Sequence, residues 1–117
     1  MLSFDGKPVY LACGHTDMRK SINGLSAIVA ASFGLDPFSV ALFVFCNRNR
    51  DRVKILEWDG DGFWLYFKRL EKGRFRWPDA ATERTMTLSG EELHMLLGSP
   101  RVIQKLKRQE LKIGVAV

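Results

Sequence analysis

A turn of alternating aspartate and glycine, Asp59-Gly60-Asp61-Gly62, lies near the middle of the 117-residue chain and constrains its fold more than any other feature. The segments on its two sides, Arg52–Trp58 and Phe63–Leu70, are rich in β-branched and aromatic residues. Aspartate and glycine favour the tight turns that join antiparallel strands. The pattern therefore predicts a β-hairpin. Its expected cross-strand pairs are Trp58 with Phe63, Leu56 with Leu65 and Arg52 with Arg69.

Further short strands are predicted on both sides of this hairpin. They are expected at Pro8–Cys13, Val40–Cys46, Arg74–Trp77 and, as an edge strand, Met86–Leu88. Polar turns separate the strands at residues 47–51 and 71–73, and Pro78 ends the strand that precedes it. Short strands joined by tight turns are typical of an antiparallel meander.

Two helices are predicted from apolar spacing and from capping residues. The first is expected to begin at Asp17 as N-cap and to end at Gly34. Its apolar stripe consists of Met18, Ile22, Leu25, Val29 and Phe33. Ser89 and Glu92 form the capping box of a short second helix. The buried face of that helix consists of Leu93, Leu96 and Leu97.

Large aromatic side chains occur on both faces of the predicted hairpin. The second aromatic face implies either a covering helix or a partner.

The length fits one domain, and a content of 46% hydrophobic and 26% charged residues is typical of a globular protein. We expect an α+β domain at residues 1–100: an antiparallel meander of four to six short strands, packed with an N-terminal helix and a short C-terminal helix. Residues 101–117 are expected to form a basic amphipathic tail. Cys13 and Cys46 lie in apolar runs and are interpreted as buried thiols. Because no export or membrane signal is visible, a cytoplasmic protein is expected.

The formal net charge of +5 is concentrated in two segments. Residues 47–76 contain nine basic and five acidic residues, and residues 99–117 contain five basic and one acidic residue. Guanidinium groups suit phosphates because their donors are forked and flat. The candidate DNA-binding residues are Arg48, Arg50, Arg52, Lys54, Lys68, Arg69, Arg74 and Arg76, with Lys105, Lys107 and Arg108 as a second patch. The alternative is a solvated basic face in which the five acids of the first segment pair with the bases.

Residue spacing does not favour a metal site, a cofactor site or a catalytic site. Asp59, Asp61 and Gly62 resemble the start of a calcium loop, but the twelfth position holds Leu70 where a glutamate is needed. His15 and His94 lie far apart, and neither has a partner at helical ligand spacing. There is no glycine-rich phosphate loop or nucleophile elbow. We therefore expect a protein that is not an enzyme and that has no metal or cofactor.

The chain contains a series of motifs in a fixed order, namely Asp17–Leu25, Asp36–Phe38, Leu42–Phe45, Asn47–Leu56, Trp58–Leu65, Lys68–Glu71 and Gly73–Pro78. Over roughly residues 9–97 this order closely resembles the second-reading-frame accessory proteins (TnpB, Orf2-like) of the insertion-sequence-66 family of bacterial transposons. The resemblance implies a role in moving the element. It also implies that the transposase active site lies on a separate, larger protein, and it supplies no catalytic residues.

Three functions follow, in order of preference. The first is a non-catalytic accessory protein that binds transposon-end DNA through the basic hairpin surface. The second is a scaffold that docks on the transposase of the same element through its second aromatic face and its tail. The third is a metal-dependent nuclease, which is disfavoured because the carboxylates lack a convergent spacing.

Overall fold

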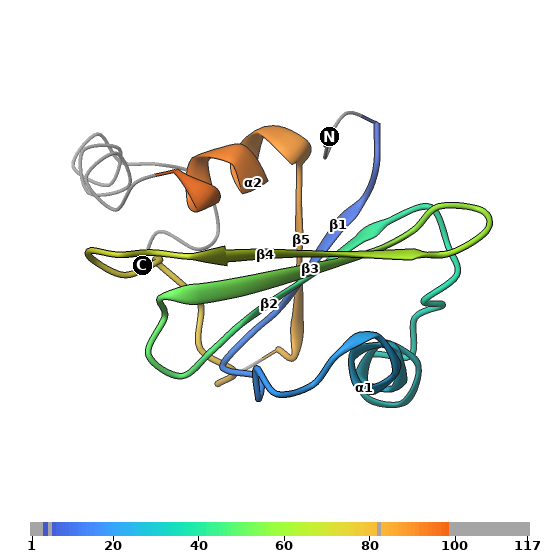
Figure 1. The fold of residues 1–117 in the computed structure, drawn as a ribbon, viewed down its shortest axis with the longest axis horizontal. Coiled ribbons are helices and arrows are strands. Elements are labelled where there is room, and N and C mark those ends of the chain that lie inside the picture. Colours follow the sequence, from blue (N-terminus) through green and yellow to red (C-terminus); the bar gives the residue numbers. More distant parts are fainter. Residues whose placement is uncertain (1–3, 5, 82, 99–117) are drawn as a thin grey trace.

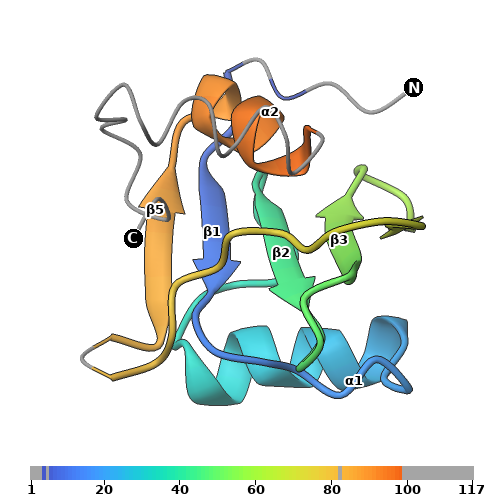
Figure 2. The ribbon, with the colours of Figure 1, turned by 90° about the vertical axis from the view of Figure 1, so that its left-hand side faces the viewer.

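Strand β2 (Leu42–Cys46) is buried along its whole length and forms the centre of a five-stranded sheet. The computed structural model describes residue 4, residues 6–81 and residues 83–98. The strand order is β4-β3-β2-β1-β5. The other strands are β1 (Val9–Ala12), β3 (Arg52–Trp58), β4 (Phe63–Arg69) and β5 (Thr85–Leu88) (Figures 1 and 2).

The predicted hairpin is confirmed together with its register. Strands β3 and β4 are antiparallel and pair Trp58 with Phe63, Leu56 with Leu65 and Arg52 with Arg69. The Asp59 amide donates to the Gly62 carbonyl at 2.8 Å and closes the turn between them. Turn chemistry therefore sets the register of this hairpin, as expected for a short loop.

The fold is a single α+β domain, as predicted, and its sheet is mixed. The antiparallel meander covers β2, β3 and β4. Strand β1 instead pairs parallel with β2, with Val9 opposite Leu42, and β5 pairs antiparallel with the other edge of β1. Parallel neighbours need a long crossover, usually helical, and the helical segment between β1 and β2 supplies it.

The helices cover opposite faces of the sheet (Figure 1). Helix α1 (Ile22–Ala27) continues into a π-helical turn, η1 (Ile28–Ser32), and buries Leu25 and Val29 against Phe43, Phe45 and Leu56. Helix α2 (Gly90–Leu97) buries its leucines on the other face. The core residues of that face include Leu93, Leu96, Val44 and Ile55. The second apolar face of the sheet is therefore explained by a covering helix.

The predicted start of the first helix is wrong: Met18 lies before it, whereas Ile22, Leu25, Val29 and Phe33 of the predicted stripe pack on one core cluster. Ser21, and not Asp17, occupies the N-cap position. The Asp17 carboxylate accepts from the Arg19 amide at 2.9 Å, which forms a local turn that competes with a helix. Gly34 follows the helix with φ +65°, a backbone conformation that glycine adopts without strain. The capping box of α2 is present as predicted, with Ser89 as N-cap and Glu92 as its partner.

The strand predicted at Arg74–Trp77 is wrong. The segment after β4 instead crosses one face of the sheet and reaches β5 (Figure 2). Phe75 and Trp77 are both buried in the same core cluster. The alternation of the sequence therefore reflects an extended chain with one buried side. It does not pair with the open edge of β4, because burial of Phe75 and Trp77 draws the segment over the face of the sheet.

The two cysteines are unpaired thiols in different surroundings. Cys46 is buried in the core, whereas Cys13 is half-buried beside a pocket. Burial raises the pKa of the Cys46 thiol to about 12, so little thiolate forms at neutral pH. We expect a thiol-alkylating reagent to modify Cys13 first and to leave Cys46 unmodified until the protein unfolds. Mass spectrometry of the wild type and a Cys13→Ser variant measures this order, and rapid labelling of folded Cys13→Ser protein would contradict it.

None of the helices in the described ranges has the length and apolar character that crossing a membrane requires.

Candidate nucleic-acid interface

Two basic loops lie side by side at one end of the sheet. The turn between β2 and β3 and the segment that leaves β4 are joined by backbone hydrogen bonds. The Leu70 amide donates to Asp51 at 2.7 Å, and the Phe75 amide donates to Arg50 at 2.6 Å. Residues 47–52 and 69–76 are called the basic loop pair below. Together they contain seven basic and two acidic residues.

The two acids of the basic loop pair are each engaged by a neighbouring arginine. Asp51 lies 3.5 Å from Arg52, and Glu71 accepts from the Arg69 guanidinium at 2.9 Å. The hydrogen bond from Asn47 lowers the pKa of Asp51, and the charges of Arg52 and Arg74 lower it further. Glu57, an acid of the same hairpin, is buried and pairs with Lys7, so it does not neutralise this end of the sheet.

Three cations of the basic loop pair are exposed and form no ion pair with an acid in the part of the chain that the structure describes. They are Arg48, Lys72 and Arg74. Lys72 is not among the sequence candidates because the sequence predicts only a turn at residues 71–73. The backbone hydrogen bonds between the two loops bring its segment beside the segment that holds Arg48.

Two other arginines of the basic loop pair, Arg50 and Arg76, are partly buried. Arg50 has φ +63°, and its guanidinium donates to the Trp77 carbonyl, which fixes the turn against the segment after β4. Arg76 is half-buried, and its Nε has no hydrogen-bond partner among the described residues. Arg50 therefore positions the loops, whereas Arg76 is only partly shielded from solvent.

The two candidate lysines on the hairpin strands are engaged by backbone carbonyls. Lys54 Nζ donates to Met18 at 2.8 Å and to Lys20 at 2.9 Å, so it anchors the loop that precedes α1. Lys68 Nζ donates to the Leu97 carbonyl at 2.6 Å, at the C-terminal end of α2. A cation is favourable at that end of a helix because of the unpaired carbonyls there.

The loop that follows β1 lies beside the turn between β2 and β3. His15, Arg19 and Arg48 line one open depression of about 600 Å³. The Thr16 amide donates to the Cys46 carbonyl at 2.7 Å, which holds the loop beside the β2–β3 turn. Hydrogen bonds from Arg19 hold the pKa of Asp17 well below its usual range, so this carboxylate stays charged and offsets Arg19.

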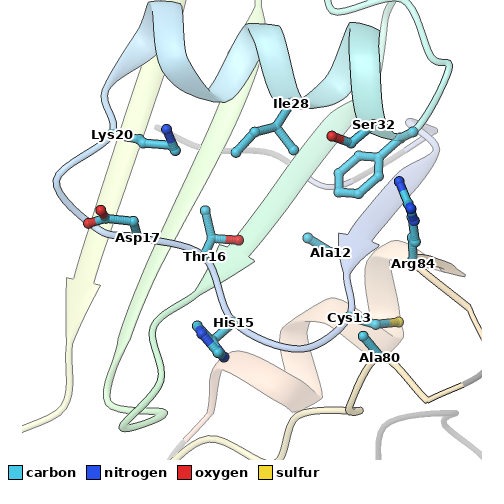
Figure 3. Close-up of a pocket in the computed structure, with 11 residues that line it drawn as sticks. Ala12, Cys13, His15, Thr16, Asp17, Lys20, Ile28, Ser32, Ala80 and Arg84 are labelled. Carbon is cyan, nitrogen blue, oxygen red and sulfur yellow. The ribbon is translucent and has the colours of Figure 1, made fainter.

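A second pocket, of about 330 Å³, lies between this loop, the π-helical turn, Ala80 and Arg84 (Figure 3). Lys20 and Arg84 stand on its two sides, with Ile28 and Ser32 between them. Burial raises the pKa of Cys13 in its wall, and the charges of Glu83 and Asp79 raise it further, so this thiol is not an activated nucleophile. Sequence spacing gave no sign of this pocket, since its walls come from distant segments.

The second candidate patch lies outside the described residues; it consists of Lys105, Lys107 and Arg108. Within the described ranges, no three His, Cys, Asp or Glu side chains gather as metal ligands would. The structure thus brings Arg48, Arg52, Arg69, Arg74 and Arg76 together with Arg50 at one end of the sheet, and it places Lys54 and Lys68 in anchoring contacts.

Comparison with known proteins identifies the family of this chain. The chain is similar to two proteins of Sinorhizobium fredii strain NGR234. It is 43% identical to the uncharacterized protein y4hO over 72 residues, which is 62% of this chain and 63% of that protein. It is 32% identical to the uncharacterized protein y4jC over 112 residues, which is 93% of this chain and 95% of that protein. No solved structure matches. The model of the family described as IS66 Orf2-like protein matches residues 7–107, and the chain therefore belongs to that family.

Proposed function

We propose that this protein binds DNA during transposition as a non-catalytic accessory protein, with the basic loop pair contacting phosphates. The IS66 Orf2-like family supports an accessory role in transposition, distinct from that of the catalytic transposase. The observation that carries the proposal is the joining of two basic loops at one end of the sheet. Arg48, Lys72 and Arg74 stand there exposed, without acidic partners among the described residues.

Phosphate contacts of this kind make DNA binding strongly dependent on salt and weakly selective for sequence. Cations that neutralise DNA phosphates release condensed counterions, so the affinity falls steeply with salt. Contacts to phosphates carry no direct sequence information, so the selectivity among DNA sequences is weak. Backbone hydrogen bonds join the two loops, and Arg50 donates to the Trp77 carbonyl, which limits the entropy lost when the surface meets DNA.

Replacing Arg48, Lys72 and Arg74 with alanine is expected to flatten the salt dependence of DNA binding. Each lost phosphate contact lowers the slope of log affinity against log salt by roughly 0.9, so three lost contacts lower it by about 2.7. Fluorescence anisotropy with a labelled transposon-end duplex measures the slope. The charge-preserving variant Arg48→Lys/Arg74→Lys should keep the wild-type slope.

A second triple variant removes the same net charge from the tail, at Lys105, Lys107 and Arg108. If the tail variant flattens the slope while the loop variant leaves it unchanged, the basic loop pair is not the interface. Equal flattening by both variants would mean that net charge, and not this surface, drives the binding. Absence of any binding at low salt would exclude DNA as the partner.

A scaffold function is favoured by a different surface, at the opposite end of the β3–β4 hairpin. Phe38 packs on Trp58 and Phe63 with ring centroids 5.0 Å and 5.3 Å away, yet remains 56% exposed. Val40 nearby in the chain is 69% exposed. Exposed aromatic and aliphatic side chains are typical anchors of protein interfaces. Co-purification with the transposase, lost in a Phe38→Ala/Val40→Ser variant that still binds DNA, would establish this additional role.

A further inference from the structure

Strand β4 is an edge of the sheet, and the parity of its hydrogen bonds shows which backbone groups face outward. Gly62 and Leu70, at the two ends of the strand, bond to the chain of β3. In an antiparallel ladder every second residue exchanges hydrogen bonds with a given neighbour. Trp64, Tyr66 and Lys68 therefore bond to β3. The amides and carbonyls that point away from the sheet belong to Phe63, Leu65, Phe67 and Arg69.

Among the described residues, this edge has few of the features that usually prevent strands from pairing with another chain. It is seven residues long, contains no proline, and pairs without a bulge. Its lysine, Lys68, is tied to the Leu97 carbonyl, and Arg69 is tied to Glu71. Trp64 and Phe67 are 54% and 56% exposed. Strand β5, the opposite edge, is only four residues long.

We propose that β4 pairs antiparallel with β4 of a second copy of this chain, around a two-fold axis at Tyr66. In this register Leu65 exchanges hydrogen bonds with Phe67 of the second copy, and Phe63 does so with Arg69. All outward-facing backbone groups of both strands are then satisfied. A two-fold contact of this kind is closed, because each copy uses the same surface.

Charge complementarity favours a second copy of this chain as the partner of β4, and it favours antiparallel pairing. Strand β4 starts after the acidic turn that contains Asp59 and Asp61, and it ends in the basic pair Lys68 and Arg69. Antiparallel pairing brings the basic end of each copy beside the acidic turn of the other. It also places Trp64 opposite Lys68 of the second copy, in a pair without hydrogen bonds, where facing side chains lie closest. Parallel pairing would oppose like charges.

Disulfide trapping tests the register. Tyr66 lies opposite its own copy in a pair without hydrogen bonds, where Cα atoms are about 4.5 Å apart, which is within the roughly 4.4–6.8 Å range that a disulfide spans. In a Cys13→Ser background, Tyr66→Cys should form a covalent dimer on mild oxidation. Trp64→Cys is the matched control. It is more exposed than Tyr66, but lies about 14 Å from its own copy in this register, so it should cross-link only when mixed with Lys68→Cys.

Sedimentation equilibrium of the full chain tests the association itself. The wild type should be a dimer, and Phe67→Pro should weaken dimerisation by about tenfold or more, because it removes an outward donor that β3 does not use. Val40→Lys, which removes another exposed apolar side chain, should leave the dimer intact.

Three results would overturn the proposal. They are a wild type that stays monomeric at every concentration, Trp64→Cys that cross-links with itself as readily as Tyr66→Cys, and an edge that pairs only with the transposase. Because the trapping experiment uses an unblocked edge, it remains informative if Phe67→Pro fails to fold. Neither readout involves DNA, so failure of this pairing is distinguishable from failure of DNA binding.

Discussion

Replacing Trp77 with alanine is expected to lower the free energy of unfolding by about 3–5 kcal/mol. The side chain is only 6% exposed and belongs to the core cluster that lies beneath α2. Its Nε1 donates to the Ala12 carbonyl at 2.8 Å, so truncation leaves a cavity and a buried acceptor without its partner. A typical domain is stable by about 5–15 kcal/mol, so this loss is a large fraction of the total.

The same substitution is expected to weaken DNA binding, although Trp77 lies in the core. The Trp77 carbonyl accepts from the Arg50 guanidinium, and the Phe75 amide donates to the Arg50 carbonyl. The buried ring anchors Trp77, whose carbonyl holds Arg50, and so it supports the joining of the basic loop pair. Without the ring the segment after β4 has more freedom, and the proposed phosphate contacts of Arg74 would carry a larger cost in ordering entropy.

Urea denaturation and anisotropy measure the two effects of the Trp77→Ala variant. Trp77→Phe keeps most of the ring volume and removes the donor, and we expect it to cost about 1–3 kcal/mol because the Ala12 carbonyl stays buried. The matched control is Trp64→Phe at an exposed site, where the change should stay within about 0.5 kcal/mol. A Trp77→Ala variant as stable as Trp64→Phe would show that the segment after β4 is not anchored by this ring.

The β3–β4 hairpin could be predicted in full because its determinants are local. Two aspartates and two glycines specify the turn, and the turn specifies which residues face each other. The capping box of α2 is likewise contained within four residues. Asp17 shows the limit of such local signals. It is a good capping residue, but the same carboxylate can accept from the amide of Arg19, and this turn takes precedence.

The roles of the basic residues could not be predicted, because they depend on contacts between distant segments. Alternation suggested that the basic residues of 48–54 share one side, but Arg48 and Arg50 lie in a turn where strand parity does not apply. Lys54 meets carbonyls more than thirty residues earlier in the chain, and Lys68 meets one nearly thirty residues later. The positive end of the sheet is therefore assembled by tertiary structure, and its exposed members are a subset of the sequence candidates plus Lys72.

Parallel pairing of β1 with β2 was also missed, although its determinant is visible in the chain. The helical stripe between the two strands supplies the crossover that parallel neighbours require. The many tight turns after Cys46 favoured a meander for the whole sheet. The length of each connection decides between these topologies, and only the β2–β3 and β3–β4 connections are short enough for hairpins.

The ion pair between Lys7 and Glu57 is the second interaction whose removal should strongly lower the free energy of unfolding. The pair lies where the chain enters β1, and it reaches across β2 to β3. The Glu57 side chain is 8% exposed, and its other oxygen accepts from the Tyr66 hydroxyl at 2.9 Å. Lys7→Met leaves a buried carboxylate with one neutral donor. Breaking a buried pair costs about 3–5 kcal/mol, and we expect about 3 kcal/mol because Lys7 is itself 28% exposed.

The double variant Lys7→Met/Glu57→Leu separates the pair from the packing around it. An apolar replacement of both partners avoids the buried charge and should recover most of the stability that Lys7→Met loses. Urea denaturation of the single and double variants gives the coupling energy directly. A double variant no more stable than Lys7→Met would mean that the stability depends on packing of the Lys7 stem and not on the charge of Glu57.

Because Lys7 is engaged far from the basic loop pair, Lys7→Met should also leave the salt slope of DNA binding unchanged while it lowers the net charge by one. Such a result would show that DNA binding depends on where the loop cations lie and not on the total charge of the chain.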